Sequence, residues 1–323
     1  MQERFEGCVV GLAVGDALGF ATEFRRRDDI LASFGPAGVT DFVGIQDARW
    51  RSRTAVLGDR HPPGTYSDDT QMSLAVAEAL LACGDASLEV LMERVAREFV
   101  AWSRSPENNR APGNTCMTAC ANLARGLPWR RAGVSDSKGC GSAMRVAPIG
   151  LRYANDRARL LEVARASSVV THGHDAAVEG AAAAALLVAL ALEGASPARM
   201  YDEIMRECAP RSADFRTCLE KLPGLLEAPP ERALSRRGLG ESWVAEEAVA
   251  AALYCVWRNP DDFSAGVLMA ANTDGDSDSI ACIAGSILGA RLGLYTIPSS
   301  WRSQVENSAR LHQVARALHA TAR

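Results

Sequence analysis

The sequence has few aromatic residues and lacks the patterns of an exported or membrane-spanning chain. Aromatic side chains make up 6% of its 323 residues, whereas alanine is abundant, so we expect a close-packed helical core. The apolar run Cys8–Phe20 is interrupted by Asp16 and follows no basic region, unlike a signal peptide. The longest uninterrupted apolar run, Ala181–Leu192, has 12 residues, which is too few to span a bilayer. We therefore predict a soluble protein that does not associate with membranes.

Cysteine pairs and an excess of positive charge are also missing. The nine cysteines are an odd number, include no Cys-x-x-Cys pair and lie partly inside apolar stretches. These features disfavour an extracellular disulfide framework and favour the reducing cytoplasm. The formal net charge is -4 and the isoelectric point is about 5.8. Such a charge does not attract polyanions, so we expect no stable complex with nucleic acid.

Apolar residues recur with the period of an α-helix along most of the chain. Alternating patterns typical of half-buried strands are absent, and no tandem repeat or low-complexity tract divides the sequence. The spacing predicts helices over 70–84, 88–103, 177–193, 244–257 and 280–292. The predicted fold class is therefore all-α, a single compact multi-helix domain over residues 1–323 with about ten or more helices.

Between these helices the sequence contains long stretches rich in Gly, Pro, Asn and Ser, at 25–66, 104–115, 128–143 and 209–240. Loops of this length in a compact domain are often functional, and we expect the first one to help set specificity. It carries the basic tripeptide Arg25–Arg27 and the spaced arginines Arg49, Arg51 and Arg53. These side chains either form a solvated surface or contact a phosphate or an acidic target.

Two short acidic segments have an unusual construction. The segment Ser67–Thr70 places adjacent carboxylates just before an apolar helix, and Asp276–Ser279 does the same much later in the chain. Ser, Thr and Asp cap helices by accepting hydrogen bonds from the free N–H groups of the first turn. One residue is enough for a cap, whereas crowded carboxylates repel one another. Capping alone therefore explains the two clusters poorly.

A divalent cation would remove this repulsion. Carboxylate and hydroxyl oxygens are hard ligands that suit Mg²⁺, Mn²⁺ or Ca²⁺ rather than Zn²⁺. Together the clusters offer enough carboxylates for two ions with shared ligands, which can orient a diol or lower the pKa of a water. An EF-hand loop beginning at Asp274 would need Gly and Glu where this sequence has Ser279 and Gly285, so an EF-hand is excluded. A different metal site and capping alone remain as interpretations.

These clusters and four further motifs, in this order, resemble the ADP-ribosylglycohydrolase superfamily. This superfamily includes the dinitrogenase-reductase-activating glycohydrolase and the vertebrate ADP-ribosylhydrolases. The motifs are Gly11–Gly19 followed by Glu23, then Tyr66–Met72, Gly113–Thr115, Gly139–Pro148, Thr171–His172 and Asp274–Ala281. Each motif alone is a weak signal, but their order over nearly the whole chain is specific. The resemblance implies an all-α fold with two Mg²⁺ or Mn²⁺ ions between the acidic clusters.

The resemblance also implies roles for individual residues. The implied metal ligands are Ser67, Asp68, Asp69, Asp276, Asp278 and Ser279, and the implied catalytic groups are Glu23, Asp69 and Asp276. The turn 139–144 matches a diphosphate-binding loop, whose glycines let backbone N–H groups approach phosphate oxygens. The implied substrate-binding residues are Gly113, Asn114, Ser137, Lys138, Gly139, Cys140, Gly141, Met144 and His172.

Some of these residues have alternative interpretations. Gly139–Gly141 is by itself typical of a tight turn, and a lone histidine such as His172 is more often a structural hydrogen-bonding residue. In the nitrogenase-regulating branch a catalytic Asp comes just before the Gly-Asn-Thr turn, where this sequence has Arg110-Ala111-Pro112. We therefore expect Glu23 or a metal ligand to carry more of the proton transfer.

The resemblance implies a metal-dependent hydrolase that removes ADP-ribose by cleaving its C1″ glycosidic bond to an acceptor, most often a protein arginine. One alternative is action of the same fold on ADP-ribosyl-serine, O-acetyl-ADP-ribose or ADP-ribosylated nucleic acid. Another is a non-catalytic binder, such as an immunity protein that neutralises an ADP-ribosyltransferase toxin. The expected partners are an ADP-ribosylated protein or nucleic acid as substrate and ADP-ribose as product.

Overall fold

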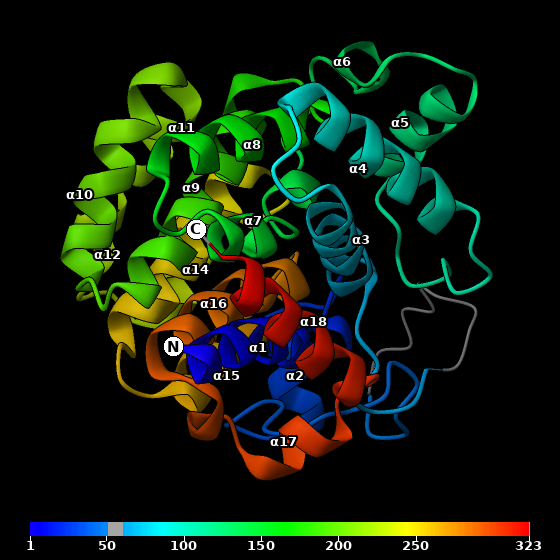
Figure 1. Ribbon diagram of the computed structural model, residues 1–323. Coiled ribbons are helices and arrows are strands. Elements are labelled where there is room, and N and C mark those ends of the chain that lie inside the picture. Colours follow the sequence, from blue (N-terminus) through cyan, green and yellow to red (C-terminus); the bar gives the residue numbers. More distant parts are fainter. Residues whose placement is uncertain (51–60, 323) are drawn as a thin grey trace.

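The computed structural model describes residues 1–50 and 61–322, and the described chain is a bundle of helices without a sheet (Figure 1). Isolated β-bridges join Val134 to His172 and Gly139 to Val244 in this part of the chain. The prediction of an all-α fold is confirmed. The helices are α1 (Gln2–Phe20), α2 (Arg27–Phe34), α3 (Asp68–Cys83), α4 (Leu88–Ser103), α5 (Asn114–Ala124), α6 (Trp129–Ala132), η1 (Cys140–Ser142), α7 (Ala147–Arg152), α8 (Arg157–Val169), α9 (Asp175–Leu192), α10 (Pro197–Glu207), η2 (Ala209–Arg211), α11 (Ala213–Leu219), α12 (Leu222–Leu225), α13 (Pro230–Ala233), α14 (Ala245–Arg258), α15 (Phe263–Ala271), α16 (Ser277–Leu292), η3 (Leu294–Thr296), α17 (Ser299–Gln304) and α18 (Ser308–Thr321).

The five helices predicted from apolar spacing are present as α3, α4, α9, α14 and α16. Helices α3 and α16 begin earlier than the spacing indicates, so their first turns include Asp68, Asp69 and Asp278. The prediction of loops is wrong in part of three stretches, because α2 lies within 25–66, α6 lies within 128–143, and α11, α12 and α13 lie within 209–240. These helices have eight residues or fewer, which is too short to display a helical period clearly. Arg51 and Arg53 lie outside the described residues.

Helices α1 and α16 pack antiparallel with their backbones in contact. Four glycines spaced four residues apart line one side of α1, and a Cβ atom at Gly15 would lie 2.0 Å from the carbonyl oxygen of Ala281. Gly285 and Gly289 provide the same clearance on α16. Residues four apart lie on one face of a helix, so this face of α1 has no side chains that would keep the backbones of α1 and α16 apart. As a result the C-terminal end of α1 meets the first turn of α16, where Gly19 faces Asp278.

Helix α9 forms the centre of the core and contacts α7, α8, α14 and α16. It is alanine-rich and apolar on every side, which is typical of a helix that other helices surround. It is also the one helix among the described residues that is long and apolar enough to cross a membrane, but 89% of it is buried inside the protein.

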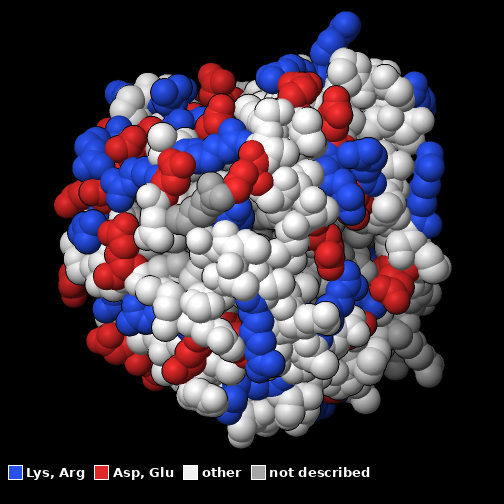
Figure 2. All heavy atoms as spheres, in the orientation of Figure 1, with Lys and Arg blue, Asp and Glu red and all other residues white. Residues whose placement is uncertain are grey.

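On the face that Figure 2 shows, basic and acidic side chains are interspersed. The nine cysteines form no disulfide.

Candidate active site

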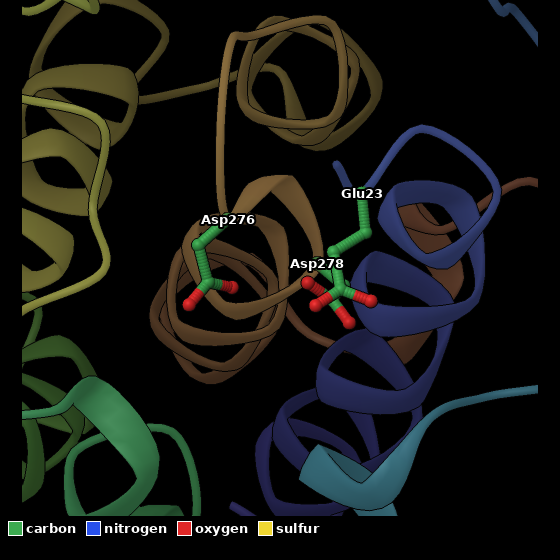
Figure 3. A group of neighbouring side chains, drawn as sticks. All are labelled: Glu23, Asp276 and Asp278. Carbon is green, nitrogen blue, oxygen red and sulfur yellow. The ribbon is translucent and has the colours of Figure 1, made fainter. Parts of the chain in front are cut away.

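Two of the predicted acidic residues meet Glu23 where α1 ends and α16 begins. Glu23 lies in the turn after α1, while Asp276 is the N-cap of α16 and Asp278 is in its first turn. A carboxylate oxygen from each of these residues lies within 4.8 Å of the others, and Figure 3 shows the Glu23 and Asp278 carboxylates side by side. Thr22 holds this turn in place, because its hydroxyl bonds to the carbonyl oxygens of Gly19 and Ala271. The glycine contact between the helices thus brings three carboxylates together.

Asp16 holds the first acidic cluster in position through hydrogen bonds to Ser67 and Thr70. This fully buried carboxylate accepts hydrogen bonds from the backbone N–H groups of Ser67 (2.8 Å) and Thr70 (2.9 Å) and from the Thr70 hydroxyl (2.5 Å). These bonds fix the start of α3, which carries Asp68 and Asp69. In the sequence Asp16 interrupts an apolar run and belongs to the motif Gly11–Gly19, but it received no role of its own. The signal that could have identified it is physical, since a carboxylate is buried among apolar residues only where several donors satisfy it.

The two acidic clusters line one cavity of about 320 Å³. Most of the predicted site residues line it, namely Glu23, Asp68, Asp69, Gly113, Asn114, Gly139, Cys140, Gly141, Met144, His172, Asp276, Asp278 and Ser279. The other described residues of its wall are Phe24, Ala111, Pro112, Thr115, Cys116 and Trp243, so no Lys or Arg is among them. A larger groove of about 460 Å³ runs along α4 and α6, but none of the predicted residues line it. The cavity is therefore acidic without a basic side chain in its described wall.

Burial and mutual repulsion raise the pKa values of the cavity carboxyl groups. Burial is the largest cause, and it holds the pKa values of Glu23, Asp68, Asp69 and Asp278 well above their ordinary values. The negative charge of Asp278 raises the pKa values of Glu23 and Asp69 further. Burial also raises the pKa of Asp276, although a hydrogen bond from the Cys140 thiol opposes this. A cluster of raised carboxyl pKa values in a cavity is typical of functional sites.

Some predicted residues lie around the cavity rather than in its wall. Ser67 is buried as the N-cap of α3, and its hydroxyl accepts a hydrogen bond from the Asp69 N–H (3.2 Å). Ser137 bonds to the Thr115 hydroxyl (3.0 Å) and accepts from the Gly139 N–H (3.4 Å). Lys138 forms ion pairs with Glu246 (2.5 Å) and Asp214 (3.1 Å). These contacts hold the acidic cluster and the loop in place.

The loop 139–141 packs against the ring of His172. A Cβ atom at Gly139 would lie 3.0 Å from His172 Nε2, and one at Gly141 would lie 3.0 Å from His172 Cε1, so both positions favour glycine. Burial and, to a smaller extent, the positive charge of Arg145 together lower the pKa of His172 to about 3. His172 is therefore neutral at physiological pH. The Cys140 thiol donates to Asp276 Oδ2 (2.8 Å), and its pKa is raised well above the ordinary value by burial, so it is not a nucleophile.

An aromatic pair forms part of the rim, and sequence analysis did not identify it. The rings of Phe24 and Trp243 stack with centroids 5.2 Å apart, and each side chain is 40% exposed. The backbone is strained here, because Phe24, Ala111 and Ser242 are non-glycine residues with positive φ angles of 61°, 55° and 66°. Such strain persists where the surrounding structure enforces it and is frequent at ligand sites.

Comparison with known proteins shows the family and the fold of this chain. The family model described as ADP-ribosylglycohydrolase matches residues 1–323. An uncharacterized protein of Archaeoglobus fulgidus is 33% identical, covering 99% of this chain and 97% of its own. ADP-ribosylarginine hydrolase Tri1 of Pseudomonas putida is 28% identical (98% and 78%), and human ADP-ribosylhydrolase ARH3 is 27% identical (98% and 93%). A solved ADP-ribosylglycohydrolase-related protein complex superposes with a TM-score of 0.78 at 30% identity, covering 100% of this chain and 99% of the other. The chain therefore belongs to the ADP-ribosylglycohydrolase family.

Proposed function

We propose that this protein is a metal-dependent hydrolase that releases ADP-ribose from a modified protein by cleaving the C1″ glycosidic bond. Membership of the family supports ADP-ribosyl hydrolase activity. The proposal that the hydrolase depends on metal rests on one observation. Five carboxylates from three segments line a single cavity, with no basic side chain in its described wall. Carboxylates that repel one another in this way are stable together only when protonated or bound to cations.

The donor atoms fit two Mg²⁺ or Mn²⁺ ions. Glu23 Oε2 and Asp69 Oδ2 are buried without a hydrogen-bond partner in the described part of the chain, and orphaned buried oxygens of this kind suit an ion. The ligands we propose are Ser67, Asp68, Asp69, Asp276, Asp278 and Ser279, all with hard oxygen donors. Bound ions would lower the pKa of a water and orient the hydroxyl groups of a sugar.

The protein's own groups would hold the rest of the substrate and move protons. The loop 139–141 would bind the diphosphate through backbone N–H groups, since its glycines allow close approach, with Gly113, Asn114 and Met144 completing the wall. Burial, the largest cause of the raised pKa of Glu23, favours the protonated carboxyl that a general acid requires, so we assign Glu23 protonation of the leaving group. Asp69 and Asp276 are then the bases for the attacking water. Breaking the bond builds positive charge on the sugar, which the surrounding carboxylates stabilise.

Arginine is the acceptor that the rim favours. A guanidinium is a planar cation that stacks on aromatic faces and binds carboxylates, and Phe24 and Trp243 stand beside Glu23 at the opening. The name of the Pseudomonas putida relative, an ADP-ribosylarginine hydrolase, supports the same acceptor. Serine-linked, nucleic-acid-linked and O-acetyl substrates are the alternatives that the assay distinguishes.

The test measures ADP-ribose release from arginine-, serine- and nucleic-acid-linked substrates and from O-acetyl-ADP-ribose, with Mg²⁺, with Mn²⁺ and after chelation. We expect release from the arginine conjugate only, and only with metal. Asp276→Asn should abolish release, because it removes a charge while keeping the oxygen that caps α16. Asp274→Asn is the matched control, since Asp274 accepts a hydrogen bond from the Arg27 N–H away from the cavity wall. Full activity after chelation would refute the metal site, and binding of ADP-ribose without release from any substrate would favour a non-catalytic binder.

A further inference from the structure

Arg145 is a fully buried cation that joins the loop to His172 without an ion pair to any described carboxylate. Its Nη1 donates to the carbonyl oxygen of Gly141 (2.7 Å). Its Nη2 donates to the carbonyl oxygen of Ser167 (3.0 Å) and to the hydroxyl oxygen of Thr171 (2.7 Å). Burial lowers the pKa of Arg145, but a guanidinium remains charged in proteins. Its position therefore links the loop, the end of α8 and the segment before His172.

The hydrogen bonds of Thr171 determine which nitrogen of His172 carries the proton. A guanidinium has no acceptor, so the Thr171 oxygen must accept from Arg145. The single hydroxyl hydrogen then has two acceptors in reach, the Ser168 carbonyl oxygen at 3.5 Å and His172 Nδ1 at 2.7 Å. The shorter distance has good hydrogen-bond geometry, whereas the longer one is at the limit. The better acceptor for the hydroxyl hydrogen is therefore Nδ1, and this arrangement favours the neutral ring with its hydrogen on Nε2.

Hydrogen bonds fix the backbone of His172, and the residue lines the cavity. The His172 N–H donates to the Ser168 carbonyl oxygen (2.7 Å), and the His172 carbonyl oxygen accepts from the Ser168 hydroxyl (3.1 Å). His172 is 2% exposed and lines the cavity beside the loop. No hydrogen bond to Nε2 is present within the described residues, and this nitrogen lies beside Gly139 and Gly141, where it is available to a ligand of the loop.

We propose that Arg145 and Thr171 are positioning residues that hold His172 in the Nε2–H form, so that it donates a hydrogen bond to an anionic oxygen of the ligand beside Gly139 and Gly141. The identity of this ligand, ADP-ribose, rests on the proposed function. A neutral donor suits this position. It can bind an anionic oxygen, whereas a positively charged His172 ring would also be attracted to the nearby carboxylates. We call the chain of contacts from Arg145 through Thr171 to His172 the relay. It also couples the loop to the His172 ring, since Arg145 contacts both Gly141 and Thr171.

The first test needs no ligand. Nitrogen-15 NMR of the two ring nitrogens distinguishes the protonated nitrogen from the bare one in the purified full-length protein. We expect His172 to be neutral with hydrogen on Nε2 in the wild type and in Thr171→Ser, which retains the hydroxyl. Thr171→Val has nearly the same shape without the hydroxyl and should give a mixture of both tautomers. Ser168→Ala, which removes a hydroxyl that contacts only the backbone of His172, should leave the tautomer unchanged. Hydrogen on Nδ1 in the wild type would overturn the relay.

The second test measures the affinity for ADP-ribose by calorimetry in the same proteins. Thr171→Val should weaken binding in proportion to the Nε2–H tautomer that is lost, by about 2-fold for an equal mixture, while Thr171→Ser and Ser168→Ala should match the wild type. Unchanged affinity in a Thr171→Val protein with mixed tautomers would refute the donor role. A wild type with the Nε2–H tautomer that does not bind ADP-ribose would refute the proposed function and the assigned ligand, while the relay would stand.

Discussion

Asp278→Asn is expected to stabilise the protein when divalent cations are absent, although it removes a proposed metal ligand. Oxygens of Glu23, Asp276 and Asp278 lie within 4.8 Å of one another. Two ionised groups at this distance repel by about 3 kcal/mol at an effective dielectric constant of 20. Asparagine removes the charge and keeps an oxygen that can accept from the Ser279 N–H, as Asp278 Oδ1 does at 3.1 Å.

Partial protonation relieves some of this repulsion in the wild type, so we expect a gain of about 1–3 kcal/mol in the free energy of unfolding. An unfolding entropy of about 2.1 cal/mol/K per residue converts about 2 kcal/mol into a rise of about 3 °C in Tm for this chain length. With saturating Mg²⁺ the order should reverse, because only the wild type gains binding free energy from the complete ligand set.

The effect should also depend on pH in a definite direction. The pKa of Asp278 in the folded protein lies well above its ordinary value, so the folded state retains a proton that the unfolded state releases. The wild type therefore loses stability as the pH rises above the ordinary pKa of an aspartate toward the higher pKa of the folded protein, and the advantage of the variant should grow in the same direction. His172, whose pKa is lowered to about 3 by burial and by Arg145, titrates in both proteins and cancels in the difference.

Urea unfolding followed by circular dichroism, with EDTA or with Mg²⁺, measures these differences directly. Asp274→Asn is the control and should match the wild type in both conditions, because it lies outside the cavity wall and keeps its bond to the Arg27 N–H. A variant less stable than the wild type in EDTA would refute the reasoning about charge repulsion. An equal gain from Mg²⁺ in the wild type and in Asp278→Asn would refute the role of Asp278 as a ligand.

Three further substitutions test other parts of the site. Glu23→Gln should lower kcat by roughly 10²–10⁴ with little change in ADP-ribose affinity if Glu23 transfers a proton, as single-turnover rates at saturating metal would show. Gly141→Ala should weaken ADP-ribose binding by about 10-fold in calorimetry, because the new Cβ would lie 3.0 Å from Cys116 Sγ and from His172. Trp243→Ala should raise KM for an arginine-linked substrate by about 5-fold while free ADP-ribose binds normally.

Each of these substitutions has a result that contradicts its assignment. Wild-type kcat in Glu23→Gln would exclude Glu23 from proton transfer, and a loss confined to metal affinity would make it a ligand only. Gly224→Ala is the control for the loop, since a Cβ there meets nothing within 4 Å, and an equal loss in both alanine variants would exclude a local effect. Weaker binding of free ADP-ribose to Trp243→Ala would place the ring against ADP-ribose rather than the acceptor.

Apolar spacing was sufficient for five of the longer helices, and local chemistry singled out the two acidic clusters, whereas the other candidate site residues came from the resemblance to the family. Helices such as α3, α4 and α9 repeat their apolar residues over several turns, so their existence follows from local sequence. The acidic residues at the starts of α3 and α16 stood out because their crowding conflicts with simple capping. The short helices α2, α6, α11, α12 and α13 were missed because a helix of one or two turns displays no clear period.

Only the tertiary structure decided how these segments meet. The glycines of α1 have no visible purpose along one chain segment, and their role appears when Gly15 lies against Ala281 on α16. Asp16 looked like an interruption until the start of α3 supplied its hydrogen-bond donors. Likewise, the tautomer of His172 depends on Arg145 through Thr171, and the rim depends on Trp243 reaching Phe24. Periodicity reports one helix at a time, whereas contacts between residues far apart in the chain depend on which helix faces pack together.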